Sequence, residues 1–171
     1  MRKLMIGVIL VILALVLAGC SLLGSRVAML NRSSEPAMAD ARTEQIIAAL
    51  QNEDAAALKA LFSEKALAEA EDFDEDVERL FEFIEKEIET GERYGYASSA
   101  TTNYGEKSLM LRFPIRINSE NDGYGFFVID YCTDTIDPEN EGLYMLEVFQ
   151  LEERTTIGPW QDRMRPGIYI H

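Results

Sequence analysis

The sequence has little of the chemistry on which many enzymes depend. Of its 171 residues only one is histidine, His171, which is also the last residue, and only two are cysteine. Zinc centres and nucleophilic triads of the common kinds need imidazoles held in a folded site. There is also no paired Cys-x-x-Cys, no glycine-rich phosphate loop and no Ser-His arrangement. The sequence therefore offers no set of catalytic residues, no metal site and no cofactor.

Positive charge is also scarce. Lysine and arginine together number 16 against 30 aspartates and glutamates, which gives a formal net charge of -14 at pH 7. Phosphate backbones repel so acidic a protein, and this excludes nucleic acid as a partner. With 47% hydrophobic and 27% charged residues, the chain has the composition of a folded protein, and its length fits a single domain.

The N-terminus has the features of an export signal. Arg2 and Lys3 precede an unbroken apolar run from Leu4 to Ala18, and the string Leu17-Ala18-Gly19-Cys20 closes it. A basic start, an apolar stretch and small residues at the cleavage site describe a secretory signal peptide. The cysteine at the cut makes the segment resemble the lipobox of bacterial lipoproteins. The alternative is a transmembrane anchor, because no charge occurs between Leu4 and Arg26 and about 20 apolar residues span a bilayer.

The lipobox resemblance implies a location and a modification. In that family the peptide is cut before the cysteine, so Cys20 becomes the first residue and its thiol carries lipid such as palmitate. The protein is then expected on the extracytoplasmic face of the cell membrane. Residues 1–19 are the expected signal peptide, 20–37 the lipidated cysteine and tether, and 38–171 the domain. Cys132 remains as the only free thiol, and we interpret it as a small buried apolar side chain.

Apolar spacing predicts helices in the first part of the domain. Two short stretches have apolar residues on one helical face: Ile46, Ile47 and Leu50, then Leu58, Leu61 and Phe62. Asn52-Glu53-Asp54 offers a cap for the second stretch, and Ser63 for a further turn. Residues 77–88 predict a longer amphipathic helix that ends near Gly91.

An acidic run precedes this longer helix. It consists of Asp72, Asp74, Asp76 and Glu78. A calcium-binding EF-hand loop needs glycine at its sixth position and glutamate at its twelfth, which here hold Val77 and Phe83. We therefore interpret Asp72 as a helix cap and the run as charges that favour a helix N-terminus.

After Gly91 the apolar period changes from helical spacing to two. The sequence predicts strands over residues 94–104, 109–117, 124–132 and 143–151, separated by turn residues at 120–123 and 137–142. Helices followed by hairpin-connected strands predict an α+β domain whose helices pack on one face of a bent antiparallel sheet.

This order resembles the NTF2-like, cystatin-like group of folds. More narrowly, the chain is similar to a family of small bacterial lipoproteins that carry a domain of unknown function. The resemblance rests on five strings: Ala57 to Ser63, Glu71 to Glu75, Leu80 to Phe83, Asn140 to Tyr144 and Pro166 to Ile170. It implies a cone-like NTF2 fold and a lipoprotein location, and it brings no catalytic residues.

The register of the hairpin, that is, which residues of the two strands lie opposite each other, predicts one ion pair in the sheet. If Asn118 faces Tyr124, the apolar row of Leu111, Phe113 and Ile115 shares a face with Phe127, Ile129 and Tyr131. Arg112 then lies across from Asp130 on the opposite face. Such a cross-strand pair contributes about 0.2–1 kcal/mol and mainly fixes register. Its other interpretation is a pair that binds substrate.

Glu147 is the most unusual carboxylate in the sequence. The strand that holds it is apolar at every alternate position except this one. Pairing through the 137–141 loop places Glu147 across from Tyr131, on the face where the helices pack. A buried charge there must find donors or stay protonated, and the Tyr131 hydroxyl is the nearest donor. A locally bulged strand would instead turn Glu147 to water.

Three functions fit these features. The first is a lipid-anchored domain that binds a small apolar or peptide-like ligand, or serves as an accessory domain, without catalysis. The second is an enzyme that uses a pocket carboxylate and tyrosine, with Glu147, Tyr131, Arg112 and Asp130 as candidate pocket residues. The third is a structural partner of another envelope protein. An open pocket favours the first two, and a filled cone favours a protein interface.

Overall fold

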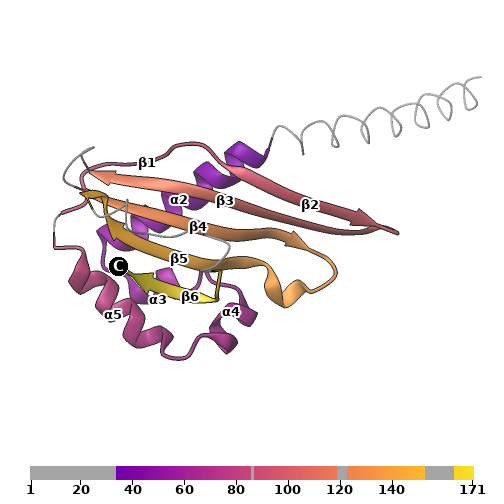
Figure 1. The fold of residues 1–171 in the computed structure, drawn as a ribbon. Helices are drawn as coiled ribbons and strands as arrows, with labels where there is room; N and C mark the ends of the chain where they lie inside the picture. Colours follow the sequence, from indigo (N-terminus) through magenta and orange to yellow (C-terminus); the bar gives the residue numbers. More distant parts are fainter. Residues whose placement is uncertain (1–33, 86, 119–122, 153–163) are drawn as a thin grey trace, which may run out of the picture. The chain divides into compact units, whose positions relative to one another are not determined.

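A computed structural model of the protein describes residues 34–85, 87–118, 123–152 and 164–171 (Figure 1). The chain divides into two units, residues 1–37 and 38–171, and the fold below is that of the second. Its helices are α2 (Glu35–Gln51), α3 (Ala55–Lys59), α4 (Glu64–Glu69) and α5 (Phe73–Phe83). The strands are β1 (Gly91–Arg93), β2 (Ala97–Asn103), β3 (Glu106–Asn118), β4 (Gly123–Asp134), β5 (Gly142–Gln150) and β6 (Gly167–Ile170), with a short 3-10 helix, η1, at Pro138–Asn140. The fold is α+β, as predicted.

The strands of the described chain form one open six-stranded sheet in the order β1-β3-β4-β5-β6, with β2 paired to β3 beside β1. All neighbours are antiparallel except β5 and β6, which are parallel. The prediction of an antiparallel sheet is therefore wrong for β6, and the sheet is mixed. A four-residue strand without a hairpin turn to its partner gives no sequence signal that fixes its direction.

Two of the predicted helix caps are confirmed. The side chain of Asp54 accepts a hydrogen bond from the amide of Ala57 at 2.9 Å, and that of Ser63 accepts one from Ala66 at 3.1 Å. Asp72 precedes α5 but makes no such side-chain bond. Capping at these positions satisfies amides that have no partner within the helix.

Two helix boundaries differ from the prediction. The longer helix predicted over residues 77–88 is α5, and it ends at Phe83 rather than near Gly91, because hydrogen bonds to the sheet hold the backbone after Phe83. The amide of Glu85 donates to the Tyr124 hydroxyl and the amide of Glu89 to the Asn118 side chain, both at 3.0 Å. At the other end, α2 already begins at Glu35, so residues 35–37 of the predicted tether are helical. No helix in the described ranges has the length and apolar character to cross a membrane.

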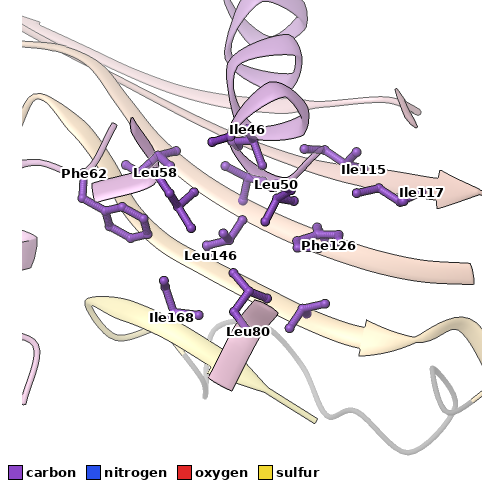
Figure 2. Close-up of a cluster of buried hydrophobic side chains, with 14 of the residues drawn as sticks. Ile46, Leu50, Leu58, Phe62, Leu80, Ile115, Ile117, Phe126, Leu146 and Ile168 are labelled. Atoms are coloured by element: carbon purple, nitrogen blue, oxygen red, sulfur yellow. The ribbon is translucent and has the colours of Figure 1, made fainter. Parts of the chain in front are cut away.

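The helices lie on one face of the sheet, with α2 crossing behind β3 and β4 and the shorter helices near β5 and β6 (Figure 1). Figure 2 shows how apolar side chains fill the space between these layers. Ten of them are labelled: Ile46, Leu50, Leu58, Phe62, Leu80, Ile115, Ile117, Phe126, Leu146 and Ile168, all buried. This packing leaves the interior of the layered domain occupied by its own side chains.

The β3–β4 hairpin pairs one residue away from the predicted register. Asn118 lies opposite Gly123 rather than Tyr124, and Arg112 lies opposite Ile129 rather than Asp130. The predicted register is wrong because β4 is apolar on both faces, so two registers both match the apolar row of β3. The core face of β4 consequently carries Phe126 and Val128.

Candidate functional site

Glu147 is buried, but on the face of the sheet away from the helices. Its neighbours Leu146 and Val148 belong to the core, and strand alternation directs Glu147 to the other side. It pairs with Phe127 rather than with Tyr131, because a register irregularity follows Ile129 and the β4–β5 connection is longer than expected. The residue is only 1% exposed, so the alternative in which it turns to water is wrong.

His171 supplies the partner that the sequence did not suggest for Glu147. Its Nε2 atom lies 2.8 Å from Glu147 Oε1, and its backbone amide donates to the carbonyl of Val148 at 3.0 Å. The single histidine of the chain is therefore held in the fold by a buried carboxylate. Since Glu147 also lies beside Tyr169 of β6 in the register, the contact helps to fasten the last strand to β5.

Asp130 pairs with a helix residue instead of Arg112. Its Oδ2 atom accepts a hydrogen bond from Arg42 Nε of α2 at 3.1 Å, and the carboxylate side chain is 2% exposed. The Cys132 thiol lies 3.6 Å from the same oxygen, so this half-buried cysteine is a weak donor rather than only an apolar filler. The predicted Arg112–Asp130 pair is wrong because the one-residue shift in register places the two side chains on opposite faces.

Arg112 and Tyr131 lie in two further surroundings. Arg112 lines a hollow of about 480 Å³ on the outer face of the sheet, together with Tyr94, Tyr96, Pro114 and Phe127 among others. The ring of Tyr131 packs edge-on against Tyr144 with 5.9 Å between centroids. The four candidate pocket residues therefore have different neighbours and do not form one pocket.

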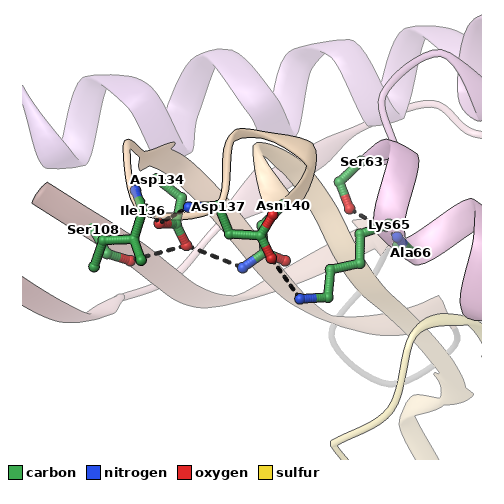
Figure 3. Close-up of polar contacts among 8 residues, drawn as sticks. All are labelled: Ser63, Lys65, Ala66, Ser108, Asp134, Ile136, Asp137 and Asn140. Atoms are coloured by element: carbon green, nitrogen blue, oxygen red, sulfur yellow. Dashed lines mark hydrogen bonds and ion pairs between the residues drawn. The ribbon is translucent and has the colours of Figure 1, made fainter. Parts of the chain in front are cut away.

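Asp134 organises the connection between β4 and β5 (Figure 3). It accepts hydrogen bonds from the Asn140 side chain at 3.1 Å and from the amides of Ile136 and Asp137 at 3.2 Å each. Burial alone would raise the pKa of the Asp134 carboxyl, but these hydrogen bonds outweigh it and hold the pKa below its usual value. Asp134 therefore has a structural role, because its carboxylate oxygens bond to groups of the loop that follows it.

Lys65 ties this connection to α4. Its Nζ atom lies 2.6 Å from Asp137 Oδ2, as the dashed line in Figure 3 marks. The hydrogen bond and the charge of Asp137 raise the pKa of Lys65 above its ordinary value. Both side chains are partly exposed, so the pair adds positional order more than stability.

A second hollow, between α4, α5 and β6, combines charge of both signs. Its volume is about 480 Å³. The charged residues of its lining are Glu69, Glu71, Asp72, Asp76, Arg79 and Arg165. Helix α5 packs against β6, so the first turn of α5 lies beside that strand. This turn contains part of the acidic run in the sequence. We refer to this place as the α5–β6 hollow.

The α5–β6 hollow already contains internal pairing. Arg79 forms an ion pair with Asp76, and the Arg165 guanidinium lies 3.7 Å from the centre of the Tyr169 ring. The Tyr169 hydroxyl donates to the carbonyl of Pro166. Burial raises the pKa of this hydroxyl, although the charge of Arg165 opposes the shift, so it remains a neutral donor. With four carboxylates and two guanidinium groups, the lining carries a net negative charge.

Comparison with known proteins identifies the family. Residues 45–152 match the family model described as "Domain of unknown function (DUF5104)". The chain belongs to this family. The match starts within α2 and ends just after β5, so it includes Arg42's partner Asp130 but neither Arg42 itself nor β6. No curated protein matches the chain.

Sequence reasoning missed two parts of the site in this DUF5104 protein. Arg42 precedes the buried Ile46 by four residues, and that spacing is a signal for a cation on the inner face of a helix. The α5–β6 hollow has a weaker signal in the sequence, because an acidic run before a helix is equally typical of helix capping. The other side of the hollow is β6. This strand pairs in parallel with β5, and no turn residues in the sequence indicate such a pairing.

Proposed function

We propose that this DUF5104 protein is an extracytoplasmic lipoprotein of the cell membrane whose domain works by binding rather than catalysis. The observation that carries the proposal is the string Leu17-Ala18-Gly19-Cys20 after the apolar run from Leu4. A hydrophobic anchor has no need of small residues followed by cysteine, whereas acylation and cleavage at that cysteine require them. These residues lie outside the described part of the chain.

The fold that we propose is NTF2-like. Support comes from the order of elements in the described ranges, four helices followed by strands, and from the placement of these helices on one face of the sheet. Within the described ranges the interior is filled by apolar side chains such as Phe113 and Phe126. A small apolar ligand between helices and sheet would have to displace them, at the cost of core packing. The filled interior therefore favours a surface ligand.

The α5–β6 hollow fits a peptide-like ligand with a cationic group. A lysine or arginine side chain would meet Glu71 and Asp72 at the start of α5, while the guanidinium groups of Arg79 and Arg165 offer donors to backbone carbonyls. The overall charge of -14 steers cations toward the surface. Such a site suits an accessory domain that holds an extended segment of another envelope protein. The enzyme alternative finds less support, because Glu147 and Tyr131 have separate partners.

Replacing Cys20 by alanine is expected to stop processing and lipidation. Labelled palmitate should enter the wild-type protein and not the Cys20→Ala variant, which should accumulate as an uncleaved precursor. Cys132→Ala is the matched control and should keep its label, because that cysteine lies in the folded domain. Normal processing of Cys20→Ala, or palmitate still entering it, contradicts the proposed lipid anchor at Cys20.

A further inference from the structure

Strand β2 is an outer strand of unusual exposure. It pairs with β3 over its whole length, from Ala97 opposite Arg112 to Asn103 opposite Glu106. All of its side chains are exposed, on both faces of the sheet. Figure 1 shows the β2–β3 hairpin reaching past the end of β4. Among the described residues, nothing pairs with the other edge of β2.

The hairpin geometry shows which backbone groups lie on that open edge. Tyr104 and Gly105 have φ of 50° and 93°, the positive values of a two-residue type I′ turn. In such a turn Asn103 and Glu106 bond to each other, and antiparallel residues alternate between bonding one neighbour and the other. The amide and carbonyl groups of Ser98, Ala100 and Thr102 therefore point away from β3.

This edge has none of the usual protection against another strand. Natural edges are blunted by charges, prolines, bulges or short length. The stretch from Tyr94 to Gly105 has no charged residue and no proline, although Arg93 and Glu106 flank it directly. Ser and Thr side chains on the strand are good cross-strand partners, and Tyr104 at the tip is fully exposed.

We propose that two copies of the protein pair through β2, antiparallel, with Ala100 at the twofold axis. The strand itself carries no charge, so the repulsion between two chains of net charge -14 is weakest along β2. The strand is also self-complementary about Ala100. Ser98 meets Thr102 of the second copy, and both present outward backbone groups, as a hydrogen-bonded pair requires. The two sheets then continue into one.

Cysteine cross-linking of the full chain in membranes tests this register, in a Cys132→Ser background. Residues opposite each other in a hydrogen-bonded pair have Cα atoms about 5.5 Å apart, within the range of a disulfide. Ala100→Cys should therefore form a disulfide dimer on mild oxidation with copper phenanthroline. Ser98→Cys and Thr102→Cys should each stay monomeric alone and cross-link when the two variants are co-expressed.

A second variant separates pairing from folding. The amide of Ala100 points away from β3, so Ala100→Pro removes a dimer bond without removing a hairpin bond. In detergent, sedimentation should show a dimer for the wild-type chain and a monomer for Ala100→Pro, with unchanged circular dichroism. No disulfide with Ala100→Cys, equal cross-linking by Thr102→Cys alone, or an adduct with a different protein would each overturn the proposal.

Discussion

Replacing Arg42 by methionine is expected to lower the free energy of unfolding by about 3 kcal/mol, at the lower end of the range for breaking a buried pair. The substitution keeps most of the apolar stem of the side chain but leaves the Asp130 carboxylate buried with only the weak Cys132 thiol as a donor. A buried carboxylate without a cation is costly because the protein interior cannot replace its hydration. Urea unfolding followed by circular dichroism measures the loss.

Two controls make the Arg42 result specific. Lys59→Met removes an ion pair with Asp74 in which both side chains are well exposed, and should cost about 0–1 kcal/mol. The double variant Arg42→Met/Asp130→Leu removes both charges and should recover much of the loss, because an apolar pair needs no compensation. If Arg42→Met lowers the free energy of unfolding no more than Lys59→Met does, Arg42 does not stabilise the buried Asp130 carboxylate.

The Gly142→Ala variant is expected to lose about 3 kcal/mol through strain and a backbone clash. Gly142 has φ of +129°, and a Cβ atom there would lie 2.8 Å from the amide nitrogen of Ser63. The adjoining Leu143 exchanges backbone hydrogen bonds with this segment: its amide donates to Leu61, and its carbonyl accepts from Ser63. Alanine must push the start of α4 away from β5, and denaturant unfolding reports the cost.

Gly105→Ala is the matched control for this variant. Gly105 also has a positive φ, +93°, but its added Cβ meets nothing within 4 Å. It therefore measures conformational strain alone, about 1 kcal/mol. Equal losses for Gly142→Ala and Gly105→Ala would contradict the close approach between β5 and the residues that precede α4.

Local signals in the sequence predicted much of the fold. Asp54 and Ser63 are short polar residues just before apolar helical stretches, and both cap helices. The strict alternation from Leu109 to Ile117 predicted β3 within a few residues. These signals succeed because they depend on neighbours close in sequence.

The register of β4 could not be predicted by the same means. Phe126 and Val128 face the core, yet Phe127 and Ile129 are equally apolar, so hydrophobicity does not distinguish the two faces. A shift of the β3–β4 register by one residue changes every cross-strand partner. Asp130 therefore faces Arg42 of α2 and not Arg112. The burial of Glu147 was predictable from its apolar alternate neighbours, whereas its contact with His171 depends on the parallel strand β6.

NMR titration of the full chain in micelles with a short lysine-rich peptide tests most directly the claim that the domain binds through the α5–β6 hollow. The account predicts shifts of backbone amides at the start of α5 and along β6, weakened by salt. Glu71→Gln/Asp72→Asn should reduce affinity several-fold, whereas Glu78→Gln/Glu82→Gln, which removes the same charge from α5 outside the hollow, should leave affinity nearly unchanged. Shifts that avoid the hollow, or equal losses in the two double variants, would contradict the account.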